Sequence, residues 1–172
     1  MAHHFSLIDV FESGPMTGNP LAVLDGVGVP EAEMTAICRW LNFSETAFLL
    51  PASDPAADYQ VRIFTPEREL PFAGHPTLGT CHVWLERGGR PKSAEIVQQC
   101  GAGQVRIRRD GDRLAFCRAA ADPVGDRSMR PVSPKSARCW IFRSARSWPL
   151  NGRPMARAGR VSGWRRRERC WR

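Results

Sequence analysis

The chain has 172 residues, of which 42% are hydrophobic and 24% are charged, and its formal net charge is +8. This length suffices for one domain with a hydrophobic core or for two small domains. The first residues carry no basic segment ahead of an apolar run, and no run of about 18 apolar residues occurs, so we expect neither an export signal nor a membrane-spanning helix. The composition therefore predicts a cytoplasmic protein without a membrane partner.

The positive charge is concentrated in the last third of the chain. Residues 1–117 contain 10 Lys and Arg against 14 Asp and Glu, whereas residues 118–172 contain 15 against 3. Four of the six tryptophans also fall in the second segment. The basic character is thus a property of the C-terminal segment, and the preceding part of the chain is mildly acidic.

The sequence carries no pattern that is typical of a bound cofactor or metal. Its six cysteines include no C-x-x-C pair and no regular close spacing, so neither a zinc site nor a disulfide framework is indicated. No G-x-G-x-x-G or P-loop pattern is present, and we therefore expect no nucleotide cofactor.

Apolar periodicity predicts the elements of the first half of the chain. Tyr59, Val61 and Ile63 alternate with other residues, as in a strand with one buried face. Met34 and Ile37 begin a run with helical spacing, and Pro30 suits the first turn of such a helix. The expected elements are strands at 5–11 and 21–24, a helix at 30–42, and strands at 46–50 and 59–64.

The second half is predicted in the same way. Pro76 indicates the start of a second helix, which the pair Gly88 and Gly89 should end. We interpret the segment before it, residues 65–70, as a solvated loop. Strands are then expected at 96–99, 105–108 and 114–116, joined as a three-stranded meander. This order predicts an α+β domain over residues 1–117, built largely from antiparallel strands.

Beyond Cys117 neither the helical nor the strand period continues. Residues 118–172 are rich in Arg, Pro, Ser, Ala, Gly and Trp, a composition that is usual in disordered segments. We expect an irregular, protease-sensitive tail whose prolines interrupt any regular element. The enrichment of this segment in residues with GC-rich codons suggests that it is translated from a shifted reading frame of a GC-rich gene. The alternative hypothesis is a non-catalytic binding protein whose basic tail engages nucleic acid or another anionic partner, which is the weaker of the two because no fold presents the tail.

The stretch "LNFSETAF", residues 41–48, places one carboxylate between a helix and an apolar strand. One interpretation is structural, with Ser44 or Glu45 accepting hydrogen bonds from exposed backbone N–H groups. The other is chemical, with Glu45 acting as a general acid/base next to Phe43 and Phe48.

The stretch "AGHP", residues 73–76, also has two interpretations. Gly74 could serve an unusual backbone angle while His75 caps the following helix. Alternatively, the free N–H groups at the helix start attract a carboxylate, and His75 donates or relays a proton.

Three motifs together resemble the PhzF family of phenazine-biosynthesis-like isomerases. They are "FSLIDVFESGPMTGNPLAV", "N-x-SE" at residues 42–45, and "FTP" followed by "E-x-PFAGHPTLGT". The resemblance extends to about Phe116 and implies a diaminopimelate epimerase-like fold, in which a curved, mostly antiparallel sheet wraps around a central helix.

The resemblance also implies a site and a reaction. Glu45 corresponds to the acid/base of the family, and Gly74 and His75 to its substrate pocket, with Asn19 and Ser44 also assigned to substrate binding. The implied activity is a cofactor-free isomerisation in which a proton leaves one carbon of a small carboxylated substrate and returns at another. A homodimer is the implied assembly. Family members have a second domain with a "D-P-A-T-G" type loop, for which this sequence shows no counterpart, so we expect the 172-residue chain to be inactive.

Overall fold

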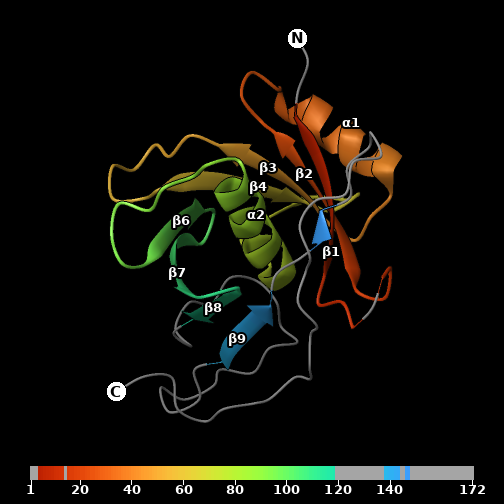
Figure 1. Ribbon diagram of the computed structural model, residues 1–172. Coiled ribbons are helices and arrows are strands. Elements are labelled where there is room, and N and C mark those ends of the chain that lie inside the picture. Colours follow the sequence, from red (N-terminus) through yellow and green to blue (C-terminus); the bar gives the residue numbers. More distant parts are fainter. Residues whose placement is uncertain (1–3, 14, 119–137, 144–145, 148–172) are drawn as a thin grey trace.

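The computed structural model describes residues 4–13, 15–118, 138–143 and 146–147. In this part of the chain a curled sheet surrounds helix α2 (Gly74–Glu86), and helix α1 (Glu31–Leu41) lies against the other face of the sheet (Figure 1). Neither of these helices is long and apolar enough to cross a membrane.

All the described strands belong to one sheet. They are β1 (Phe5–Val10), β2 (Asn19–Asp25), β3 (Thr46–Leu50), β4 (Tyr59–Phe64), β5 (Glu69–Leu70), β6 (Ile96–Cys100), β7 (Gly103–Asp110), β8 (Arg113–Arg118), β9 (Arg138–Arg143) and β10 (Arg146–Ser147). Their spatial order is β10-β1-β2-β3-β4-β6-β7-β8-β9, and β5 pairs with β4.

The sheet is mixed but mostly antiparallel, as expected. The two parallel pairs are β2 with β3 and β4 with β6. Each pair is joined through a helix, α1 in the first case and α2 in the second, because a parallel connection needs a long crossover. The three-stranded meander of β6, β7 and β8 is confirmed.

The alternation of side chains along β2 creates two cores. Leu21 and Val23 belong to the core on the α2 face of the sheet. Ala22 and Leu24 belong to the core on the other face, where they pack with Met34 of α1. Since successive strand residues point to opposite faces, one strand serves both helices.

Helix α2 is buried almost all round, which requires a close approach to the sheet. A Cβ atom at Gly79 would lie 2.6 Å from Leu21 Cδ2 and 3.1 Å from Val10 Cγ2. Both of those side chains are fully buried. The absence of a side chain at Gly79 therefore sets the distance between α2 and strands β1 and β2.

The structure corrects two of the predicted boundaries. Helix α2 begins at Gly74, two residues before Pro76; a proline fits in the first turn because no intrahelical hydrogen bond is lost there. Residues 65–70 are not only a loop, since β5 pairs with β4 through Ile63 and Leu70. A tight turn, in which the Thr65 N–H donates to the Arg68 carbonyl at 2.8 Å, permits this hairpin.

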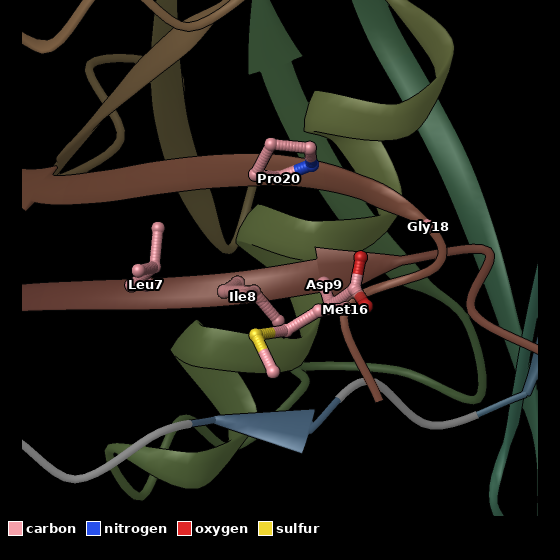
Figure 2. Close-up of a pocket in the computed structure, with 6 residues that line it drawn as sticks. All are labelled: Leu7, Ile8, Asp9, Met16, Gly18 and Pro20. Carbon is pink, nitrogen blue, oxygen red and sulfur yellow. The ribbon is translucent and has the colours of Figure 1, made fainter. Parts of the chain in front are cut away.

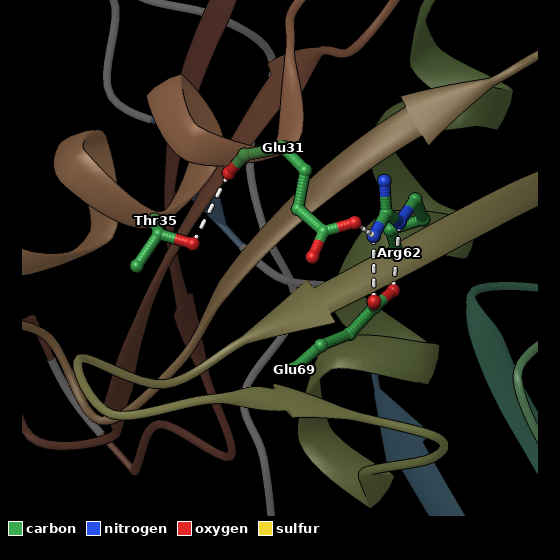
Figure 3. A network of polar contacts seen from close by, with 4 residues as sticks. All are labelled: Glu31, Thr35, Arg62 and Glu69. Atoms are coloured by element: carbon green, nitrogen blue, oxygen red, sulfur yellow. Dashed lines mark hydrogen bonds and ion pairs between the residues drawn. The ribbon is translucent and has the colours of Figure 1, made fainter.

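An ion-pair network on the α1 face fixes β5 in place (Figure 3). Arg62 of β4 donates from Nε and Nη2 to the two carboxylate oxygens of Glu69, at 2.7 and 2.6 Å. Its Nη2 also donates to Glu31 Oε2 at 2.7 Å, so the network joins α1 to the sheet. The two carboxylates raise the pKa of Arg62.

Part of the expected irregular tail is regular. Strand β9 pairs antiparallel with β8, and β10 pairs with β1. The β9 sequence "RCWIFR" contains aromatic and β-branched residues and no proline, which favours a strand. The other predictions for the tail, including binding to nucleic acid, concern segments 119–137, 144–145 and 148–172, which lie outside the described residues.

The close approach at Gly79 leads to a stability prediction. We expect Gly79→Ala to unfold at lower urea concentration than Gly74→Ala, by the equivalent of about 1–3 kcal/mol, because the added methyl group overpacks a buried contact. Gly74 is the matched control on the same helix, since a Cβ there would meet only Phe116 Cζ at 3.7 Å. Both changes gain helix propensity, so this term largely cancels in the comparison. Equal stability of the two variants would contradict the prediction.

Candidate active site

Four of the five residues predicted for the site are brought together in the structure by side-chain contacts. Asn19 is the first residue of β2, Ser44 and Glu45 directly precede β3, and His75 lies in the first turn of α2. The fifth, Gly74, is the first residue of α2.

Local structure explains how segments far apart in the sequence meet. Asn42 ends α1 in the left-handed conformation, with φ of 54°, which an asparagine adopts readily. The chain then turns into β3, which runs parallel to β2 with Ala22 opposite Thr46. Because parallel strands begin at the same edge of a sheet, Asn19 and Glu45 lie at that edge.

A chain of polar contacts links the four side chains. Ser44 Oγ donates to Asn19 Oδ1 at 3.1 Å. Asn19 Nδ2 lies 3.3 Å from His75 Nδ1, and His75 Nε2 lies 3.7 Å from Glu45 Oε2. The last distance is too long for a hydrogen bond.

The pair of Glu45 and His75 combines burial with unused hydrogen-bonding capacity. The His75 side chain is 7% exposed and that of Glu45 is 18% exposed. Neither Glu45 Oε2 nor His75 Nε2 has a hydrogen-bond partner among the described residues. Buried polar atoms are usually satisfied, so such a pair is typical of a site that binds another polar group.

Burial also controls the charge of His75. Loss of solvent lowers the pKa of His75 below its ordinary value of 6.5, and the nearby Glu45 carboxylate opposes this effect only in part. The imidazole is therefore neutral at pH 7, with one nitrogen as donor and the other as acceptor.

The structure argues against the purely structural interpretation of the second motif, residues 73–76. The N-cap of α2 is Ala73, and no side chain caps this helix, so His75 is not a cap. Gly74 is not among the described glycines with positive φ, and it therefore serves no unusual backbone angle.

The start of α2 offers backbone donors. Pro76 has no N–H group, and the Thr77 N–H donates to the Ala73 carbonyl at 3.2 Å. The N–H groups of Gly74 and His75 precede this bond at the positive end of the helix dipole. An anion such as a carboxylate is the group that such an end attracts.

A buried chain of polar side chains, which the sequence does not predict, lies behind this helix start. Tyr59 Oη donates to Gln98 Oε1 at 3.0 Å, and Gln98 Nε2 donates to Thr77 Oγ1 at 3.1 Å. Thr77 Oγ1 in turn donates to the Ala73 carbonyl at 2.9 Å. These residues are far apart in the sequence, and the only local signal was a threonine one residue after Pro76.

A separate pocket of about 140 Å³ lies on strands β1 and β2 (Figure 2). It is lined by Leu7, Ile8, Asp9, Met16, Gly18 and Pro20. Asp9, its only charged residue, accepts a hydrogen bond from the Thr17 N–H at 3.1 Å. The pocket contains none of the predicted site residues, and its lining is mostly apolar, so we place the candidate chemistry at Glu45 and His75.

Comparison with known proteins gives consistent matches. The family model for phenazine biosynthesis-like proteins, PhzC-PhzF, matches residues 8–131. Antisense-enhancing sequence 1 of Schizosaccharomyces pombe is 46% identical over 113 residues, which are 64% of this chain and 38% of that protein. Trans-2,3-dihydro-3-hydroxyanthranilate isomerase of Pseudomonas fluorescens is 49% identical over 79 residues, 45% of this chain and 28% of that protein. The crystal structure of a PhzF-family phenazine biosynthesis protein from Bacillus anthracis gives a TM-score of 0.60 at 30% identity, covering 73% of this chain and 45% of that one.

The chain therefore belongs to the family of phenazine biosynthesis-like proteins. The fold expected from the resemblance, a curled sheet around a central helix, is confirmed. Several of the curated relatives are named isomerases. The chain spans less than half the length of the relatives cited above.

The burial of His75 predicts a specific response to pH. Because the pKa of His75 is lower in the folded state than its unfolded value of 6.5, the unfolded chain binds more protons as the pH falls below that value. The stability contributed by His75 is therefore present above pH 6.5 and is lost as the pH falls toward the folded pKa. We expect His75→Gln to flatten this part of the curve of urea midpoint against pH.

The matched control is His82→Gln, on the same helix but outside the chain of contacts that joins the site residues. We expect the His82→Gln variant to keep the loss of stability that His75 causes as the pH falls. An unchanged pH profile in His75→Gln would show that this imidazole is not desolvated in the folded chain.

Proposed function

We propose that the chain is a cofactor-independent isomerase of the PhzF type, in which Glu45 moves a proton between carbons of a small carboxylated substrate. The main support is the buried pair of Glu45 and His75, whose facing atoms lie 3.7 Å apart and lack hydrogen-bond partners among the described residues. Membership of the family and the isomerase names of its relatives agree with this proposal.

The proposed reaction needs a single acid/base group. Glu45 takes the proton from one carbon, and the electron pair of the broken C–H bond enters the conjugated system of the substrate. The protonated Glu45 then returns the proton at a different carbon, so the substrate keeps its atoms and its oxidation state. A positioned carboxylate is suited to both steps, because its conjugate acid is formed in the first and consumed in the second.

The start of α2 supplies the proposed binding site for the substrate carboxylate. The Gly74 and His75 N–H groups and the dipole of α2 favour a negative charge at this end. His75 adds a neutral ring N–H, because its lowered pKa keeps it uncharged at pH 7. In this arrangement the substrate is held beside Glu45, and the neutral His75 does not compete with Glu45 as a second charged side chain for the substrate proton.

The role of Glu45 is tested in a chimera. Residues 4–118 of this chain replace the matching segment of the trans-2,3-dihydro-3-hydroxyanthranilate isomerase of Pseudomonas aeruginosa, which is similar to this chain over 135 residues, and turnover of trans-2,3-dihydro-3-hydroxyanthranilate is measured. We expect Glu45→Gln to lower kcat by about 10²–10⁴-fold, because an amide cannot carry the proton. The matched control is Glu67→Gln, in an exposed loop, which should leave turnover unchanged.

Near-full turnover by Glu45→Gln in a folded chimera would overturn the assignment. The 172-residue chain is assayed beside the chimera, which tests the prediction that it is inactive. Gel filtration of both proteins tests the implied homodimer.

A second kinetic prediction concerns His75. We expect His75→Ala to raise KM in the chimera by roughly 10- to 100-fold, the loss of one hydrogen bond to a charged group. Stability should change less than binding, since His75 caps no helix. A sharp fall in melting temperature with an unchanged KM would instead indicate a structural role for His75.

A further inference from the structure

The contacts of His75 determine which of its ring nitrogens carries the proton. Asn19 Nδ2 lies 3.3 Å from His75 Nδ1. The Asn19 carboxamide is oriented by Ser44, whose hydroxyl donates to Oδ1 at 3.1 Å. Its oxygen is therefore engaged on the side of Ser44, and its nitrogen faces the imidazole.

A carboxamide nitrogen can only donate a hydrogen bond. With Asn19 Nδ2 as the donor in this contact, His75 Nδ1 is the acceptor and carries no proton. In a neutral imidazole the proton is consequently on Nε2, the nitrogen that lies 3.7 Å from Glu45 Oε2.

We propose that Asn19, oriented by Ser44, is a positioning residue that holds His75 in the tautomer with its proton on Nε2. This inference rests on the proposed function only for its consequence in catalysis. The sequence had assigned Asn19 and Ser44 to substrate binding, and the geometry gives them this other task.

The consequence concerns the group that His75 presents to Glu45 and to a bound ligand. With the proton on Nε2, the imidazole presents an N–H donor on the side of Glu45 Oε2. With the other tautomer, the Nε2 lone pair would face the carboxylate and repel it. Asn19 therefore keeps a ring donor available to a bound carboxylate.

The test is the tautomeric state of His75, measured by long-range ¹H–¹⁵N NMR of the histidine-labelled 172-residue chain. Spectra are recorded at about pH 8, above the ordinary histidine pKa, so that the ring is neutral. The His75→Gln spectrum assigns the signals. We expect Nε2 to be protonated and Nδ1 to be unprotonated in the unmodified chain.

Two substitutions at Asn19 separate the proposal from its alternatives. Asn19→Asp presents only acceptors to the ring, so His75 Nδ1 should gain a proton. Asn19→Ala removes the donor, so the Nδ1 resonance should shift as its hydrogen bond is lost. The proposal would be overturned if His75 Nδ1 stays unprotonated in Asn19→Asp. It would also be overturned if the Nδ1 resonance does not move in Asn19→Ala. If Asn19→Asp does not fold, Asn19→Ala alone decides.

Matched controls test the competing explanations. Asn42→Asp introduces the same change three residues before Glu45, at an exposed position, and should leave the tautomer unchanged. Glu45→Gln should also keep the proton on Nε2 while Asn19 is present. Loss of this tautomer in Glu45→Gln would show that Glu45, and not Asn19, selects it.

This measurement is independent of turnover. If Asn19 fixes the tautomer but Glu45→Gln retains turnover in the chimera, the proposed function fails and the inference about Asn19 stands. If Asn19 has no effect on the ring while Glu45→Gln is inactive, the reverse holds.

Discussion

The burial of α2 within the curled sheet governs how the strands pack and where the candidate site forms. A helix that is enclosed on nearly every side must approach its neighbours closely, and Gly79 permits this approach to Leu21 and Val10. The strands of the sheet pack around this helix on one face and against α1 on the other. The position of α2 therefore determines where its first turn lies relative to the start of β3.

The same enclosure explains why polar groups surround the start of α2. The end of a helix leaves backbone groups without intrahelical hydrogen-bond partners, and burying such groups without other partners costs free energy. The chain from Tyr59 through Gln98 to Thr77 adds a second hydrogen bond to the Ala73 carbonyl, which already accepts one from the Thr77 N–H, and it thereby pairs the buried polar side chains behind the helix start. On the other side, Asn19 satisfies one ring nitrogen of His75 and leaves the second for Glu45. The protein thus fixes this end of α2 while leaving specific atoms available for binding.

The candidate site also shows how burial and charge are balanced. Desolvation keeps His75 neutral despite the neighbouring carboxylate, whose effect opposes it. A protonated imidazole would attract the carboxylate strongly and form an ion pair with it, whereas a neutral ring leaves the Glu45 carboxylate without an ionic partner at His75. This balance suits a site in which one carboxylate has to exchange protons with a substrate.

Sequence periodicity predicted most of the elements, and the motifs marked the residues of the candidate site. Alternation in β4 and helical spacing in α1 predicted their bounds closely, because each pattern reflects burial of one face of a local element. The motifs around Glu45 and His75 carried the resemblance to the family. The hairpin of β5 and strand β9 were missed, because short strands are stabilised by their partners, Ile63 and the β8 strand, and not by a local pattern.

The contacts among the candidate site residues depend on the tertiary fold. Asn19 and His75 are separated by 56 positions, and no periodicity relates them. Their contact arises because β2 and β3 begin at one edge of the sheet and the enclosed helix α2 starts beside it. Hydrogen-bond direction, desolvation of the imidazole and the 3.7 Å spacing to Glu45 depend on this packing, and a linear sequence contains none of these distances.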